Sequence, residues 1–201
     1  MADAMMTADA GVRAGALSRL FQGREAEAKA GPLSLREMPV PGQINLRGKA
    51  SDPAFAGAAA KVLGCGLPVA ANTVATGGDI SVLWLGPDEW LVLSAPGAEG
   101  GLSVSLIEAL AGQHCAVTDV TGNRALFRLS GAPARDVLAK GCSLDLHPSK
   151  FAPGQCAQTL LARSGIILSQ IDDAPSFDIL PRRSFAEYTW LWLEDAMAEW
   201  G

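Results

Sequence analysis

The sequence predicts an α+β fold made of two copies of one unit, because residues 43–111 and 124–200 present the same elements in the same order. Each copy contains an apolar strand, a helix, a hairpin, another strand and a final helix. The first helix of each copy is expected to start at a proline and to stop at the pattern Gly-Cys-x-Leu. Since the order, the prolines and the stops agree together, we interpret them as an internal duplication of a β-α-β-β-β-α unit whose copies pack into one body.

The first strand of each copy is an apolar run, at residues 44–48 and 125–131. A proline follows each run, Pro53 in the first copy and Pro133 in the second. Proline suits the first turn of a helix because the N–H that it lacks would have no helical partner there. The sequence therefore predicts a short helix after each first strand.

Gly64 and Gly141 are expected to end these helices, because glycine readily adopts the left-handed conformation that a helix end commonly requires. A hairpin follows each stop. Its strands are predicted at residues 72–76 and 80–85 in the first copy and at residues 158–162 and 166–171 in the second.

A turn rich in proline and aspartate leads to the last strand of each copy, since these residues preset the geometry of tight turns. The turns are predicted at residues 86–89 and 172–175, and the strands at residues 90–93 and 177–180. A strand after Cys115 is expected to join the two copies.

Each copy is predicted to end in a helix, at residues 102–111 and 185–200. Ser184 and Glu187 form the pattern of a capping box at the start of the second of these helices. In that motif each side chain accepts a hydrogen bond from the backbone N–H of the other residue. The pattern indicates where the helix begins.

Apolar residues of the last helix form two stripes at helical spacing. The first stripe contains Phe185, Tyr188, Leu191 and Trp192, and the second contains Trp190, Leu193, Met197 and Trp200. One stripe can face the core. We expect the second stripe to be an interface with another protein, because a soluble protein seldom leaves a continuous aromatic patch in water. Trp84 and Trp90, which flank a turn, are candidates for the same interface. The alternative, that both stripes pack inside this chain, stays open.

Composition restricts the class of protein. A chain of 201 residues with 49% apolar types can bury one good core or two small ones, but it is too short for a large multidomain enzyme. The net charge is −5 and the basic residues are scattered, so no nucleic acid partner is expected. No apolar stretch approaches the roughly 20 residues that span a bilayer, and the start lacks a secretory signal, so we expect a cytoplasmic protein without a membrane partner.

Cysteine spacing agrees with a reducing compartment, since the four cysteines form no close pair typical of a metal site. Cys65 and Cys142 occupy matching positions in the two copies. A disulfide between them is conceivable from that symmetry. Buried free thiols are the favoured interpretation.

Residues 1–31 are expected to form a mobile arm, followed by the duplicated α+β domain at residues 32–201. The arm is rich in alanine, glycine and small polar residues, and its few apolar anchors, such as Leu17 and Phe21, cannot fill a core. Residues 14–21 could form a short amphipathic helix, whose ordering would need a partner surface.

Few groups suit catalysis. His114 precedes a predicted strand and His147 precedes a proline, so each has a structural explanation. Apolar neighbours could raise the pKa of Asp119, but turn formation with nearby threonines is the favoured interpretation. The loop at residues 96–101 could hold an anion, except that Glu99 would repel it. We therefore predict no catalytic, cofactor-binding or metal-binding residue on this chain.

Three motifs in combination resemble the gamma subunit of heterotetrameric sarcosine oxidase. They lie at residues 84–91, 141–148 and 183–188, and the resemblance runs from about Leu35 to Trp200. It implies a fold similar to that of the folate-binding aminomethyltransferases. It also implies a non-catalytic assembly role in a complex that demethylates sarcosine oxidatively to glycine, with release of hydrogen peroxide and of formaldehyde or 5,10-methylenetetrahydrofolate.

The resemblance further implies partners and the cofactors that they hold. In this family the alpha subunit carries NAD and the tetrahydrofolate site, the beta subunit carries FAD and FMN, and the delta subunit carries zinc, while gamma carries none. The alternative function is a stand-alone folate-binding protein of the aminomethyltransferase type, with Asp119 as a polar anchor. An unrelated interaction module is a third possibility.

Overall fold

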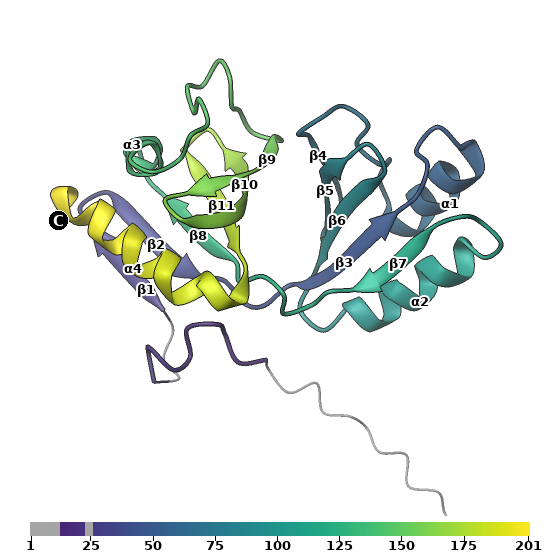
Figure 1. Ribbon diagram of the computed structural model, residues 1–201, viewed down its shortest axis with the longest axis horizontal. Coiled ribbons are helices and arrows are strands. Elements are labelled where there is room, and N and C mark those ends of the chain that lie inside the picture. The colour runs from purple at the N-terminus through teal and green to yellow at the C-terminus, as the bar shows by residue number, and fades with distance from the viewer. Residues whose placement is uncertain (1–12, 23–25) are drawn as a thin grey trace, which may run out of the picture.

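The protein, described here by a computed structural model, is defined at residues 13–22 and 26–201, and it contains two antiparallel sheets (Figure 1). The first unit comprises β3 (Gly42–Arg47), α1 (Pro53–Leu63), β4 (Val74–Gly77), β5 (Ile80–Gly86), β6 (Glu89–Ser94) and α2 (Glu99–Ala109). The second unit comprises β8 (Phe127–Ser130), α3 (Ala134–Ala139), β9 (Cys156–Leu161), β10 (Ser164–Asp172), β11 (Ser176–Pro181) and α4 (Ala186–Met197). The predicted elements therefore occur in the predicted order.

Both sheets arrange their repeated strands in the same way. The first sheet has the order β4-β5-β6-β3-β7, with β7 at Ala116–Asp119. The second has the order β9-β10-β11-β8-β2-β1, with β1 at Glu27–Ala30 and β2 at Leu33–Glu37. The α+β fold with a repeated β-α-β-β-β-α order is thus observed.

The strands that precede the two units are exchanged between the sheets. β2 comes before the first unit along the chain but pairs with β8 of the second. β7 comes before the second unit but pairs with β3 of the first. Equivalent hydrogen bonds follow the two strands: Met38 donates to the Leu126 carbonyl at 2.8 Å, and Val120 donates to the Gln43 carbonyl at 2.8 Å. This exchange ties the two units into one body.

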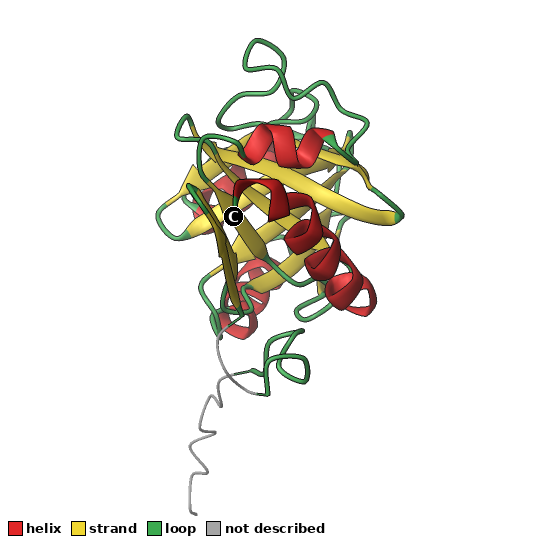
Figure 2. Ribbon diagram, turned by 90° about the vertical axis from the view of Figure 1, so that its left-hand side faces the viewer, coloured by secondary structure: helices red, strands yellow, loops and turns green. Residues whose placement is uncertain are grey.

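The protein has four layers: a layer of helices, the first sheet, the second sheet and another layer of helices. Apolar side chains form a core between each pair of neighbouring layers. Helices α1 and α2 cover the outer face of the first sheet, and α3 and α4 cover the outer face of the second (Figures 1 and 2). The inner faces meet in a smaller core, where Leu83 and Leu91 of the first sheet pack with Ile167 and Leu180 of the second. The helices therefore lie outside and the sheets face each other.

The described part of the amino-terminal segment packs mainly against the second unit, so the prediction of a mobile arm up to residue 31 is wrong there. β1 pairs with β2 at the edge of the second sheet. The Leu17 side chain is 1% exposed and belongs to the core of the second unit. Residues 16–22 form turns instead of the predicted helix. The remainder of the predicted arm, residues 1–12 and 23–25, lies outside the described residues.

Helix α1 begins and ends as predicted. Pro53 occupies its first turn, and the Asp52 side chain accepts a hydrogen bond from the Ala54 N–H at 2.9 Å. Gly64 ends the helix with φ 70°, in the left-handed region.

The corresponding glycine of the second unit has another role. Gly141 does not have a positive φ. A Cβ added to it would, however, lie 2.5 Å from the Trp192 ring. Close packing against α4, and not a left-handed helix end, therefore requires glycine at this position.

Two other predicted helix starts differ from the structure. Glu99 begins α2, so the end of the predicted loop at residues 96–101 is helical. α4 follows a short 3-10 turn at Arg183–Phe185, and no side chain caps its first N–H groups, so the predicted capping box of Ser184 and Glu187 does not form. The 3-10 turn leads directly into the α-helix instead.

Candidate functional site

Four of the six predicted interface residues lie in the chain's own cores, so that prediction is wrong for them. Trp90, Trp190 and Leu193 are 0% exposed and Met197 is 1% exposed. Buried side chains have no surface to offer to a partner. Trp84 and Trp200 are partly buried against the cores of the first and second units, and the Lys140 ammonium lies 4.5 Å from the centre of the Trp200 ring.

The two buried tryptophans are fixed by specific contacts. Trp190 lies between Phe21 and Phe127, with both phenylalanine rings edge-on at 5.4 Å between ring centres. The indole N–H of Trp90 donates to the Pro68 carbonyl at 2.8 Å, which satisfies its one polar group inside the core of the first unit. These contacts identify both residues as core anchors.

The stripe of α4 that faces solvent is the one predicted to face the core. Phe185, Tyr188 and Leu191 are 43%, 39% and 47% exposed, and we refer to them as the α4 outer stripe. Charge is the sequence signal that could have identified this solvent-facing side of α4. Glu187 and Asp195 lie four residues on either side of Leu191, and both are exposed. Positions four apart share one helix face, so these acids mark the outer face.

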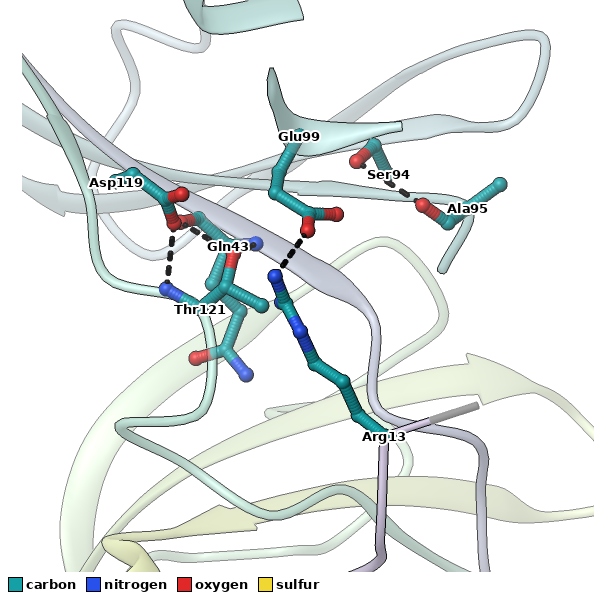
Figure 3. Close-up of polar contacts among 7 residues, drawn as sticks. All are labelled: Arg13, Gln43, Ser94, Ala95, Glu99, Asp119 and Thr121. Carbon is teal, nitrogen blue, oxygen red and sulfur yellow. Dashed lines mark hydrogen bonds and ion pairs between the residues drawn. The ribbon is translucent and has the colours of Figure 1, made fainter. Parts of the chain in front are cut away.

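Asp119 does not have the raised pKa that a catalytic base at neutral pH would need. Its carboxylate accepts a hydrogen bond from the Thr121 N–H at 2.8 Å (Figure 3). The hydrogen bonds from Thr121 lower the pKa of Asp119, since they stabilise its charged form. The predicted turn role agrees with this geometry.

Glu99 lies at the start of α2 and excludes the anion site considered for that loop. Its side chain is buried, and one carboxylate oxygen forms an ion pair with Arg13 at 2.7 Å (Figure 3). Arg13 comes from the amino-terminal segment, so this ion pair fastens that segment to the first unit. A buried carboxylate at the helix start would repel an anion.

The histidines and cysteines do not converge on a reaction centre. His147 is exposed in a loop, where its ring nitrogen Nδ1 lies 2.8 Å from the Ser149 hydroxyl. His114 and Cys115 line a broad pocket of about 770 Å³ whose other walls include the exposed Val69. Within residues 13–22 and 26–201, no group of three or more His, Cys, Asp or Glu residues is arranged to hold a metal ion.

The cysteines are free thiols, including Cys65 and Cys142, so the symmetric disulfide is not present. Burial raises the pKa of Cys156 to about 11. A thiol with such a pKa is almost entirely protonated at neutral pH, and the thiolate is the reactive form. Cys156 is therefore a core residue.

A cleft of about 410 Å³ lies between the two sheets. Arg128 and Asp178 project into it and form two hydrogen bonds, at 2.7 and 2.9 Å. The bonds to Asp178 raise the pKa of Arg128. This ion pair links β8 to β11, and its two charges neutralise each other inside the cleft.

No helix of the described residues is long and apolar enough to cross a membrane.

Comparison with known proteins identifies the family. Residues 47–199 match the model of the sarcosine oxidase, gamma subunit family. The chain belongs to this family. A sarcosine oxidase gamma subunit of Corynebacterium sp. (strain P-1) is 37% identical over 200 residues, which cover 99% of this chain and 97% of the relative. One of Arthrobacter sp. is 39% identical over 171 residues, covering 85% and 82%.

Solved structures agree with this gamma subunit assignment. A chain of the heterotetrameric sarcosine oxidase of Corynebacterium sp. U-96, in complex with pyrrole 2-carboxylate, superposes with a TM-score of 0.84 at 36% identity, covering 94% of this chain and 96% of that one. Aminomethyltransferase T of the glycine cleavage system from Bartonella henselae gives a TM-score of 0.64 at 14% identity, covering 90% and 57%. The latter likeness concerns the fold alone. The family and fold predicted from the three motifs are confirmed.

Proposed function

We propose that this gamma subunit is a non-catalytic assembly component of a heterotetrameric sarcosine oxidase, which demethylates sarcosine oxidatively to glycine with release of hydrogen peroxide. The observation that carries the proposal is the likeness, over 94% of this chain, to one chain of a solved heterotetrameric sarcosine oxidase. The one-carbon unit would leave as formaldehyde or as 5,10-methylenetetrahydrofolate.

The side chains of the described residues support an assembly role. Asp119, Glu99 and Asp178 each have a structural partner. The resemblance to the gamma subunit family implies that FAD, FMN, NAD, zinc and tetrahydrofolate are held by the alpha, beta and delta subunits. Two features of this chain support that proposal: its described part has no group of three or more His, Cys, Asp or Glu residues that could hold a metal ion, and its inner cleft contains a neutralised ion pair. Gamma would contribute surface to those partners.

The test is co-expression with an affinity tag on the largest subunit. We expect gamma to be retained with the other subunits, and the purified complex to consume sarcosine. The isolated gamma subunit is expected to show neither flavin absorbance nor tetrahydrofolate binding. Turnover of sarcosine, or a flavin spectrum, from gamma alone would refute the assembly role, and folate binding by gamma alone would favour the stand-alone alternative.

The α4 outer stripe is the contact surface that we propose for a partner subunit. Changing Leu191, 47% exposed, to glutamate should weaken retention of gamma about tenfold, because truncation of an important interface residue costs more than about 1 kcal/mol. The free energy of unfolding should fall by no more than about 1 kcal/mol, because the new carboxylate lies four residues from both Glu187 and Asp195 and each like-charge pair costs about 0.2 to 0.5 kcal/mol. Retention is measured by quantifying gamma in the tagged complex.

Ile107 on α2 provides a matched control, since it is a similarly exposed aliphatic residue, at 55%, on the other unit. Ile107→Glu is expected to leave retention unchanged. If Leu191→Glu assembles as well as the unaltered chain, the α4 outer stripe is not a subunit contact.

A further inference from the structure

Two arginines lie side by side at the end of the second sheet. Arg124 and Arg182 form an isolated antiparallel bridge just beyond β8 and β11. A guanidinium N–H of Arg124 donates to the Leu180 carbonyl at 3.0 Å. The ion pairs found within residues 13–22 and 26–201 involve neither arginine.

This arrangement leaves positive charge without a matching negative charge. Burial, and then the positive charge of Arg182, lower the pKa of Arg124, which means that its surroundings disfavour the charged form. The chain has 21 acidic residues and a net charge of −5, yet none of its described carboxylates lies within 4.0 Å of either guanidinium. An added carboxylate would relieve both the repulsion and the cost of burial.

The two arginines line a pocket of about 550 Å³, which we call the arginine pocket. Ser143 and Thr159 also line it, as does Leu160, which is 55% exposed. The planar guanidinium fork matches the two oxygens of a carboxylate. The pocket therefore offers donors for an acid beside an apolar wall.

The arginine pocket adjoins the α4 outer stripe. Arg163 lies in the turn between β9 and β10, the strands that supply Leu160 and Gly165 to the pocket. Its backbone N–H donates to the Tyr188 hydroxyl at 3.3 Å. Exposed apolar residues next to unpaired arginines are typical of a protein interface, where arginine and aromatic residues are enriched and lysine is depleted.

We propose that the arginine pocket receives an aspartate or glutamate side chain of a partner subunit, with an apolar neighbour of that acid seated on Leu160. This inference rests on the proposed role of the chain as a subunit. A free small anion would make use of the arginines but would leave Leu160 and the adjoining α4 outer stripe uncovered, so a polypeptide fits the whole surface better.

A charge reversal tests the proposal in the assembled complex. Arg182 is exposed, so Arg182→Glu should fold normally and should lower retention of gamma by about tenfold or more, since removing one partner of an interfacial charge pair has effects of that size. Lys150→Glu is the matched control: it makes the same change in net charge at an exposed position of the same unit. Retention of both variants at the level of the unaltered chain would overturn the proposal.

Cross-linking identifies the occupant. Arg182→Lys keeps the positive charge and provides an amine, which a carbodiimide condenses with a neighbouring carboxylate to an amide as the carbodiimide takes up the water lost. We expect a cross-linked peptide that joins position 182 to an aspartate or glutamate of a larger subunit. An assembled complex without this cross-link would refute docking of a partner acid and leave a small anion as the occupant. Failure of unaltered gamma to co-purify would instead refute the proposed function.

Discussion

Replacing Trp190 with alanine is expected to lower the free energy of unfolding by about 3 to 5 kcal/mol, the range typical of buried aromatic residues truncated to alanine. The side chain is 0% exposed, and it joins α4 to Phe127 of β8 and to Phe21 of the amino-terminal segment. Its loss would open a cavity where these three parts of the chain meet. Rigid neighbours can fill such a cavity only in part, which is why the cost exceeds the transfer free energy of the side chain.

The measurement is equilibrium unfolding in denaturant, with Tyr188→Ala as the control on the same helix. Tyr188 is 39% exposed and its hydroxyl accepts a hydrogen bond from the Arg163 N–H, so its truncation should cost about 1 to 2 kcal/mol, less than that of Trp190. Equal costs for the two variants would show that Trp190 does not anchor the core. Any loss of Trp190→Ala from the complex should follow the loss of folded protein, because the side chain is not on the surface.

The α4 residues show why sequence periodicity predicted the helix but not its inner face. Spacing of three and four residues groups Trp190 with Leu193 and Met197, and groups Tyr188 with Leu191. Both groups are apolar, so their spacing alone does not distinguish the core from the surface. The exposed acids Glu187 and Asp195 mark the outer face, whereas Phe21 and Phe127, which cover Trp190 on the inner face, lie far from α4 in the sequence.

Local signals predicted the elements well and their long-range partners poorly. Pro53 marks the start of α1 and Gly64 marks its end, and both could be predicted because helix ends depend on a few adjacent residues. The sequence contains no comparable local signal for the exchange of β2 and β7 between the sheets, because the residues of one strand do not specify which strand it pairs with. The arginine pocket was missed for the same reason: Arg124 and Arg182 meet only because β8 pairs with β11.

Gly131→Ala tests how the exchanged strand β2 reaches the second sheet. Gly131 has φ 124°, a conformation that side chains rarely allow, and a Cβ there would overlap the Pro32 carbonyl oxygen and lie 3.2 Å from the Leu33 Cα. The substitution should lower the free energy of unfolding by about 2 to 6 kcal/mol, because backbone strain costs about 1 to 3 kcal/mol and overpacking costs about 1 to 3 kcal/mol.

The damage from Gly131→Ala should be localised first to the pairing of β2 with β8, where Ser34 lies opposite Ser130. Amide hydrogen exchange should therefore become faster in β2 than in β6 of the first sheet. Gly57→Ala is the control, because Gly57 is exposed in α1 and a Cβ there meets nothing within 4 Å. In a helix interior that change is expected to stabilise the protein by about 0.5 to 1 kcal/mol. The same substitution should thus have opposite signs at the two glycines, and an unchanged stability of Gly131→Ala would mean that β2 does not approach β8 as closely as this fold requires.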